Sequence, residues 1–277
     1  MNSLPENITE SVRIALAEDV GDGDKTAALL QSGISEARVI AREQGVLCGT
    51  AWFDEVFHQL DTATRITWNH ADGDAFHNES ELCTLTGDIR TLLTGERTAL
   101  NFLQTLSATA TQTARYVSAI SHTSCRLLDT RKTIPGLRAA QKYAVLCGGG
   151  MNHRMGLFDA ILIKENHISA AGSIKKAIAA ARVSFPGVFV EIEVENLDEF
   201  EQALDAGPDR ILLDNFSNEA LKSACVLNSG CNQLEASGNI KLENIAAIAE
   251  TGVNYISTGS ITKNVQAIDL SMLLVTG

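Results

Sequence analysis

Apolar and polar positions follow different periods along the chain, and the change of period predicts its organisation. Residues 36–92 alternate between apolar and polar side chains, as in Ala37–Arg42 and Leu82–Asp88. Such alternation is typical of half-buried strands in a mainly antiparallel sheet. An amphipathic helix is predicted before this region, at Ile8–Glu18, and a long one after it, from Gly95 to about Ser121. We therefore expect an N-terminal α+β domain.

From residue 125 onward a different unit repeats: a short apolar run with a polar end, a loop, and an amphipathic helix. Six such runs are present: Cys125–Asp129, Ala160–Lys164, Val188–Val194, Arg210–Asp214, Asn232–Ala236 and Asn254–Thr258. The helices predicted between them include Ser173–Val183, Leu197–Ala206, Asn218–Leu227 and Leu242–Glu250. Successive units of this kind build a parallel sheet, which is either open and doubly wound or closed into a barrel.

Two observations favour a barrel. No Gly-x-Gly-x-x-Gly follows the first run, and polar residues end nearly every run, whereas an open sheet uses a single switch point. The repeating segment is shorter than the about 250 residues that eight units typically need. The expected fold class is therefore α/β, an incomplete parallel α/β barrel of six to seven strands with an N-terminal α+β domain. The predicted domains are 1–107, the barrel at 108–264, and a C-terminal segment at 265–277 that packs on the N-terminal domain.

Composition and charge restrict the class of protein. The formal net charge of -12 disfavours nucleic acid and anionic lipid as partners, because both are bound by an excess of Lys and Arg. Residues 126–164 depart from this balance, with seven Lys or Arg against two acids, which indicates a local anion site or a solvated basic face. The six cysteines lack a Cys-x-x-Cys pair. Since no leader or long apolar run occurs, we expect a cytoplasmic protein without a membrane span.

Ionisable residues gather where the predicted strands end. In parallel barrels these ends converge on one mouth, where catalytic groups stand. The strand ends supply Asp129, Arg131, Lys132, Lys164, Glu193, Asp214, Glu235 and Ser237. His153 and Arg154 follow the triple glycine at 148–150, which permits close approach of a ligand. We interpret this set as a functional site for an anion, the alternatives being ordinary turn residues, a helix cap at the glycines, and salt bridges between the charged groups.

Two glycine-containing turns, 237–239 and 258–260, follow the last two predicted strands and precede helices. Backbone amides at such positions bind phosphate groups. Glu193 and Asp214 are carboxylates among these phosphate-binding elements, and carboxylates in that setting bind hydrated Mg²⁺. The alternative for the two acids is a salt bridge with Lys164 or Lys132. We therefore predict Mg²⁺ as the cofactor of a phosphorylated substrate.

Three segments resemble one known family over almost the whole chain. Residues 128–138 read LDTRKTIPGLR, residues 153–157 read HRMGL, and residues 162–167 read LIKENH. These motifs resemble quinolinate phosphoribosyltransferases, also called carboxylating nicotinate-nucleotide pyrophosphorylases. The resemblance implies transfer of phosphoribosyl from phosphoribosyl pyrophosphate to quinolinate with decarboxylation, which gives nicotinate mononucleotide, pyrophosphate and CO₂ in NAD biosynthesis.

The resemblance also implies roles for individual residues. The carboxylates of quinolinate would be held by Arg131, His153, Arg154 and Lys164, and Arg97 would come from the partner subunit of a homodimer or higher even oligomer. Phosphoribosyl pyrophosphate and metal would be held by Thr130, Lys132, Glu193, Asp214, Ser237, Gly238, Asn239, Thr258, Gly259, Ser260 and Lys263. Catalysis is expected of Lys164, Glu193 and Asp214, the last two binding the metal. Lys263 stands where many members carry His, which is a departure from the family pattern.

Three other functions remain open at this stage. One is a relative associated with molybdenum transport, although Arg97, Arg131 and Arg154 favour quinolinate. Another is a Schiff-base lyase that uses Lys164 at a strand end, as aldolase barrels do. The third is a ligand-binding protein without catalysis, for which a mouth of ionisable groups has no chemical use.

Overall fold

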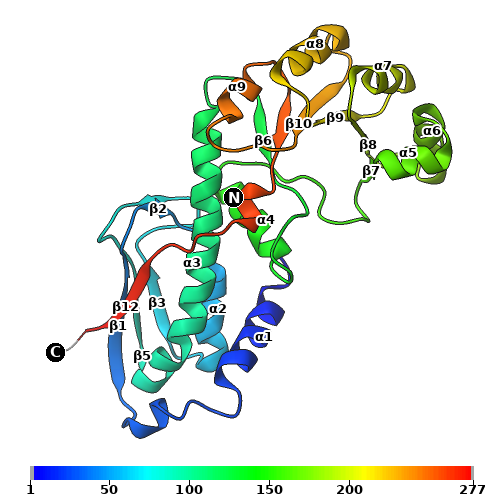
Figure 1. Cartoon of the computed structure of the whole chain (residues 1–277). Helices are drawn as coiled ribbons and strands as arrows, with labels where there is room; N and C mark the ends of the chain where they lie inside the picture. Colours follow the sequence, from blue (N-terminus) through cyan, green and yellow to red (C-terminus); the bar gives the residue numbers. More distant parts are fainter. Residues whose placement is uncertain (1–2, 276–277) are drawn as a thin grey trace. The chain divides into compact units, whose positions relative to one another are not determined.

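The computed structural model describes residues 3–275 and divides into two compact units (Figure 1). The N-terminal unit consists of residues 1–114, 134–149 and 264–277, and the barrel unit of 115–133 and 150–263. The long helix α3 (Ile89–Ala119) runs from the first unit into the second. Three segments thus build the N-terminal unit, and the polypeptide passes from one unit to the other more than once.

The N-terminal unit contains a four-stranded antiparallel sheet in the order β12-β1-β5-β3. Its strands are β1 (Ile34–Ala41), β3 (Arg65–Trp68), β5 (Glu81–Asp88) and β12 (Leu270–Leu274), and a separate pair joins β2 (Gly45–Val46) to β4 (Ala75–Phe76). Ala37, Val39 and Ala41 are fully buried on alternate positions of β1. The structure therefore confirms the half-buried strands that the alternation predicted. One face of the sheet covers the core, and the other face does not.

A helix interrupts the region in which the sequence pattern predicted strands. α2 spans Thr50–Leu60 and buries Trp52, Phe53, Val56 and Phe57, at spacings of one, three and four. The sequence pattern of residues 36–92 did not predict this helix, because the strands on both sides of it alternate strongly and the helix is only three turns long. α2 begins after Gly49, which has a φ of +111° and thus makes the sharp turn into the helix.

The remaining helices of the N-terminal unit share its core. They are α1 (Ile8–Val20), the short 3₁₀ helix at Ala27–Leu29, the first part of α3, and α4 (Arg138–Cys147). α4 lies between barrel segments in sequence, yet its Tyr143 packs on Trp52 with ring centroids 5.7 Å apart. Its pattern resembles that of any helix in a βα unit, so the sequence-based division did not set residues 134–149 apart from the barrel.

The barrel unit is built on six parallel strands in the order β6-β11-β10-β9-β8-β7. They are β6 (Arg126–Leu128), β7 (Ile161–Ile163), β8 (Val190–Val194), β9 (Arg210–Asp214), β10 (Gln233–Ser237) and β11 (Tyr255–Ser257). Each lies within or one residue beyond a predicted run. In residues 3–275 no strand pairing joins β6 to β7, so the sheet has two edges. The prediction of an incomplete barrel with six to seven strands is confirmed.

Helices follow the strands of the barrel unit and cover their outer side (Figure 1). They are α5 (Glu165–Ala171), α6 (Ile174–Ser184), α7 (Leu197–Ala206), α8 (Asn218–Asn228), α9 (Ile245–Ala249) and α10 (Ser260–Lys263). Ser173, Asn196 and Ser217 accept hydrogen bonds from the first turns of α6, α7 and α8. These N-caps fix where each of the three helices begins.

The C-terminal segment ends in the N-terminal sheet. β12 pairs antiparallel with β1, and Met272 lies opposite Val39 in the register. In the described part of the chain, no helix combines the length and the apolar character that crossing a membrane requires.

Candidate active site

A cavity of about 400 Å³ lies at the C-terminal ends of the barrel strands. Every residue that lines it belongs to the barrel unit. The lining consists of Thr130, Arg131, Lys132, His153, Arg154, Leu162, Lys164, Glu193, Leu212, Asp214, Glu235, Ser237 and Ser257. Nine of the predicted site residues, and also Glu235, therefore share one cavity. Of the five Lys and Arg residues predicted in the barrel unit, four line it and Lys263 does not.

Arg131 and Arg154 both line this cavity, and their positive charges repel each other. Burial lowers the pKa of Arg154, and the nearby positive charge of Arg131 lowers it further. One amino group of Arg154 donates to the carbonyl of Ala160 at 3.2 Å. A pair of guanidinium groups that repel each other in a partly buried place is stabilised by a bound anion, which planar carboxylates satisfy best.

The loop that carries His153 and Arg154 is fixed by a buried acid. The backbone N–H of His153 donates to Asp129 at 2.8 Å, and Asp129 is fully buried at the end of β6. The following loop is held by Asp159, whose carboxylate accepts from the N–H groups of Met155 and Gly156. The triple glycine of residues 148–150 thus leads into a well-anchored turn rather than into a loose loop.

Lys164 and the two candidate metal ligands stand on neighbouring strands. Lys164 donates to Glu193 at the end of β8, so the salt bridge considered from the sequence is present. Asp214 ends β9 and accepts from the side-chain amide of Asn215 at 2.7 Å. Lys164 is already engaged by Glu193, which argues against Lys164 as the nucleophile of a Schiff-base lyase.

The carboxylates of Glu193 and Asp214 are oxygen ligands of the kind that bind Mg²⁺ in proteins. Mg²⁺ is usually bound by one or two carboxylates together with substrate phosphates and water, and not by a complete protein cage. Glu193 and Asp214 both line the cavity. In the described residues, the groups of three close metal-ligating side chains are Cys48, Asp72 and Cys147, and His153, Glu191 and Glu235. Glu193 and Asp214 therefore fit a metal that arrives with a phosphorylated substrate.

The two glycine-containing turns lie next to the cavity. Gly238 has a φ of +93°, and a Cβ there would stand 2.1 Å from the side-chain oxygen of Asn215. A Cβ on Gly259 would stand 2.9 Å from two carbons of the Lys132 side chain. The hydroxyls of Thr258 and Ser260 are hydrogen-bonded to each other at 3.0 Å. Both glycines are thus required by the close approach of a neighbouring residue, and for Gly259 this neighbour is the predicted ligand Lys132.

Seven predicted site residues do not line the cavity. Arg97 is an exposed residue of α3 in the N-terminal unit. Lys263 is exposed at the end of α10. The other five belong to the two turns: Gly238, Asn239, Thr258, Gly259 and Ser260. The turns are continuous with Ser237 and β11, so they border the cavity, whereas nothing within the barrel unit accounts for Arg97.

A layer of three charged residues, Glu191, Arg210 and Glu235, lies beneath the cavity. The sequence pattern did not identify Glu191 and Arg210 as candidate site residues. Glu191 and Arg210 stand near the starts of β8 and β9, and Glu235 on β10 joins them. Glu191 precedes Glu193 by two residues and Glu235 precedes Ser237 by two, so each pair faces the same side of the sheet. That period of two was the available signal.

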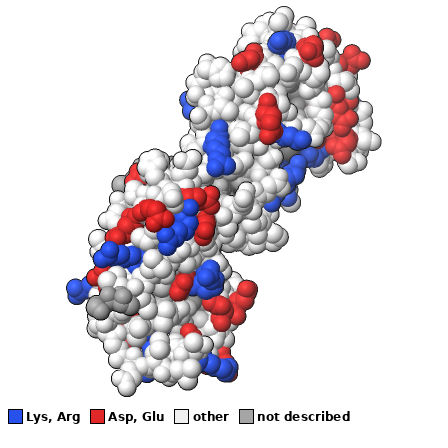
Figure 2. Space-filling view, turned by 60° about the vertical axis from the view of Figure 1, so that its left-hand side comes forward, with Lys and Arg blue, Asp and Glu red and all other residues white. Residues whose placement is uncertain are grey.

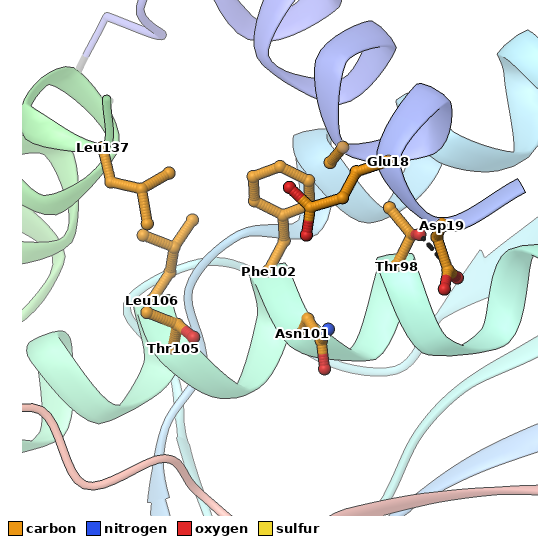
Figure 3. A pocket seen from close by; sticks show the side chains of 9 residues that line it. Glu18, Asp19, Thr98, Asn101, Phe102, Thr105, Leu106 and Leu137 are labelled. Carbon is orange, nitrogen blue, oxygen red and sulfur yellow. Dashed lines mark hydrogen bonds between the residues drawn. The ribbon is translucent and has the colours of Figure 1, made fainter. Parts of the chain in front are cut away.

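A second hollow, of about 250 Å³, lies on the N-terminal unit between α1 and α3 (Figure 3). Phe102, Leu106 and Leu137 form its apolar part, and Glu18 and Asp19 stand at its other side (Figure 3). Its charged lining residues are acids. Carboxylates repel an anionic substrate, so this hollow does not suit the chemistry of the barrel cavity.

The surface has both signs of charge in small groups. Figure 2 shows Lys and Arg side chains interspersed with Asp and Glu side chains on the visible face. With a net charge of -12, the cations that line the barrel cavity are therefore a local feature of an acidic protein. Such a local reversal of charge concentrates a small anion at the site.

Two family models match consecutive parts of the chain. Residues 24–107 match the quinolinate phosphoribosyl transferase N-terminal domain, and residues 109–273 match the C-terminal domain of the same family. Together these matches extend over most of the sequence and include the whole of the cavity lining.

Individual relatives agree with these models. A probable carboxylating nicotinate-nucleotide pyrophosphorylase from Synechocystis is 42% identical over 94% of this chain and 90% of its own length. One from Bacillus subtilis is 40% identical over 92% of this chain and 89% of its own length. A solved nicotinate-nucleotide pyrophosphorylase structure from Francisella tularensis is 50% identical, with a TM-score of 0.97 over 99% of this chain and 98% of that one. The chain belongs to the quinolinate phosphoribosyltransferase family.

Proposed function

We propose that the protein transfers the phosphoribosyl group of phosphoribosyl pyrophosphate to quinolinate and decarboxylates the product. Nicotinate mononucleotide, pyrophosphate and CO₂ are formed, and the reaction supplies NAD biosynthesis. Membership of the family and the names of relatives about 40% identical support this reaction. The observation that carries the proposal is the pair Arg131 and Arg154 in one cavity with Lys132 and Lys164. A small substrate with several negative charges is what such a cavity stabilises.

In this proposal the two carboxylates of quinolinate lie against Arg131, Arg154 and Lys164. Guanidinium groups donate two parallel hydrogen bonds to a carboxylate and so fix its plane as well as its position. The bound dianion relieves the repulsion that lowers the pKa of Arg154. Binding at this place holds the ring nitrogen at short range from the ribose carbon that it attacks.

Phosphoribosyl pyrophosphate binds on the other side of the cavity, to Thr130, Lys132 and the turns at 237–239 and 258–260, with Lys263 beyond them. Glu193 and Asp214 would hold Mg²⁺, and the chemistry that this ion would supply is stabilisation of negative charge on pyrophosphate. Lys132 provides a second, fixed positive charge for the same oxygens. Glu193 is paired with Lys164 in the structure, so if Glu193 held the metal, Lys164 would be available to a substrate carboxylate.

The chemical step depends on charged side chains that the fold holds in the cavity before the substrates bind. Positive character develops at the ribose carbon as pyrophosphate leaves, and the carboxylates of Glu193 and Asp214 lie in the same cavity. After the ring nitrogen is alkylated, its positive charge stabilises the carbanion that loss of CO₂ leaves at the adjacent carbon. This carbanion takes up a proton from water, which gives nicotinate mononucleotide. The role of the protein in that step is to orient the carboxylate with Arg131, Arg154 and Lys164 and to exclude competing reactions.

The assembly and the compartment are part of the proposal. The homodimer brings Arg97 of one subunit to the barrel cavity of the other, since Arg97 lies on the N-terminal unit and is exposed. The compartment is the cytoplasm, which suits the six cysteines because they form no disulfide in residues 3–275 and thiols remain reduced there.

One assay tests the reaction. Purified protein is incubated with phosphoribosyl pyrophosphate, Mg²⁺ and quinolinate labelled in the carboxylate next to the ring nitrogen. Nicotinate mononucleotide and labelled CO₂ are expected in equal amounts, and omission of Mg²⁺ should stop both. Turnover of nicotinate in place of quinolinate would contradict the substrate assignment, and formation of no nucleotide from either acid would contradict the reaction.

A further inference from the structure

The ring of His153 is held from below by buried acids. Its Nε2 lies 2.8 Å from Glu191 and 3.7 Å from Glu235. The side chains of the two acids are 2% and 0% exposed, so water does not replace these contacts. His153 lines the substrate cavity at the same time, and its side chain therefore connects the buried layer with the site above it.

The hydrogen bonds of the imidazole define where its proton is. Nδ1 accepts the backbone N–H of Arg154 at 2.7 Å. A ring nitrogen that accepts a hydrogen bond carries no proton, so the proton of neutral His153 is on Nε2 and is donated to Glu191. The backbone N–H of Arg154 is thus held by a ring whose orientation depends on an acceptor beneath it.

Arg210 keeps the two acids in place. It donates to Glu235 at 2.8 Å and lies 4.0 Å from Glu191. Its guanidinium stands over the rings of Phe189 and Tyr255, at 5.2 and 4.1 Å from their centroids. The acceptor under His153 is therefore part of a rigid layer whose cation is fixed on two sides.

A layer of this kind does little for stability by itself. Replacing a buried ion pair by apolar groups of similar volume is often neutral or stabilising. The free energy needed to remove the two charges from water is about as large as the free energy of their attraction. Glu191 accepts the proton of His153, which is a site residue. We therefore explain the place of Glu191 by its effect on the orientation of the His153 ring. In addition, Glu191 is the acid closer to Nε2.

We propose that Glu191 is a positioning residue for the dicarboxylate substrate: it accepts the Nε2 proton of His153, and the oriented ring in turn fixes Arg154. This inference rests on the proposed function. Loss of the acceptor frees the imidazole, and the backbone N–H of Arg154 loses its partner. The guanidinium that receives a substrate carboxylate is then no longer directed into the cavity.

Two substitutions separate this role from a structural one. Glu191→Leu removes the acceptor, and Glu191→Gln retains an amide oxygen that can accept from Nε2. KM for quinolinate should rise by about tenfold or more in Glu191→Leu, as expected for a lost hydrogen bond to a charged group. KM for phosphoribosyl pyrophosphate should change by less than about threefold, and Glu191→Gln should recover most of the affinity for quinolinate.

A control variant carries a comparable change outside the site. Asp209→Asn weakens the ion pair with Arg182, 2.8 Å long, in the same unit and without contact with His153. It should lower the unfolding temperature while KM for quinolinate stays unchanged. If Asp209→Asn and Glu191→Leu alter KM for both substrates alike, Glu191 acts only through stability, and the inference is wrong.

Nitrogen-15 spectra of histidine-labelled protein test the hydrogen bond without catalysis. His153, assigned with a His153→Gln variant, should show the Nε2–H tautomer in the wild type and in Glu191→Gln, and a mixture in Glu191→Leu. A wild-type His153 with its proton on Nδ1 overturns the inference even if Glu191→Leu does not fold. Should the wild type fail to turn over quinolinate while the tautomer is as stated, the proposed function fails, and calorimetric titration of Glu191→Leu with quinolinate decides the positioning role.

Discussion

At the scale of single residues, the site is defined by charges that the fold holds in unfavourable places. Arg154 is partly buried beside Arg131. Its burial and the positive charge of Arg131 both lower the pKa of Arg154. Glu235 is fully buried beside Glu191. Ionisable groups with shifted pKa values are typical of functional sites, where their charge binds a ligand or orients a neighbouring side chain. The arginines could be named from the sequence, because their motif and position at strand ends are visible there.

Replacement of Arg154 by alanine should abolish useful turnover without unfolding the protein. Two charge-assisted hydrogen bonds of about 1.5–3 kcal/mol each are lost, so kcat/KM for quinolinate should fall by about 10²–10⁴. The free energy of unfolding should change by less than about 1 kcal/mol, because burial and Arg131 oppose the charge in the free protein. Arg126→Ala, at the exposed opposite end of β6, is the matched control and should keep full activity.

The carboxyl group of Glu235 should make stability depend on pH. Burial, and then the charge of Glu191, raise its pKa from 4.5 to about 7. Between these values the folded protein holds a proton that the unfolded chain has released, so the free energy of unfolding falls as pH rises. The effect reaches about 3 kcal/mol across this window. The positive charge of Arg210 and a hydrogen bond from Ser257 oppose the shift and limit its size.

Glu235→Gln removes this titration while keeping the shape of the side chain. Chemical denaturation of wild type and variant at about pH 5 and pH 8 gives the difference in slope. The wild type should lose stability relative to the variant as pH rises through the window. Parallel pH profiles for the two proteins would show that Glu235 does not hold its proton in the folded state.

At the scale of elements, the period of the apolar positions was sufficient to predict the barrel strands and insufficient to predict helix α2. All six barrel strands were predicted, since each is a short apolar run followed by a polar end. α2 was not, because its Trp52 and Phe53 lie among strongly alternating strands. The inward-facing Glu191 was also missed, since a charged residue inside a strand looks like an exposed one until its neighbours are known.

Opposite faces of β12 should respond differently to charge. Met272 is 8% exposed and faces the core, whereas Leu273, the next residue, is 48% exposed. Met272→Glu should lower the free energy of unfolding by about 3 kcal/mol or more, because a carboxylate is buried without a partner. Leu273→Glu, the matched control, should lie within about 0.5 kcal/mol of wild type. Equal effects of the two substitutions in urea denaturation would contradict the register with β1.

At the scale of the whole molecule, sequence proximity does not decide which unit a segment joins. Residues 134–149 lie between two barrel segments, yet α4 contributes Tyr143 to the core of the N-terminal unit. The sequence could not indicate this, since an amphipathic helix presents the same apolar face to either core. The C-terminal strand was expected on the N-terminal domain, but its apolar periodicity did not reveal an edge strand beside β1.

The proposed sharing of Arg97 between subunits can be tested by mixing two inactive proteins. Arg97→Ala and Arg154→Ala should each lose activity with quinolinate. After subunit exchange, half of the dimers are mixed, and each has one intact site, so about a quarter of wild-type activity should return. Mixtures that stay inactive after exchange is demonstrated would place Arg97 and Arg154 in the same site of one subunit or exclude Arg97 from the site.

The most direct test of the central claim is a crystal structure of the protein with quinolinate bound. Both carboxylates of the ligand should lie in the cavity at the C-terminal ends of β6 to β11, within hydrogen-bonding distance of Arg131, Arg154 and Lys164. The acidic hollow between α1 and α3 should contain no quinolinate. Ligand density in that hollow, with the barrel cavity vacant, would contradict the claim that the barrel's cations form the substrate site.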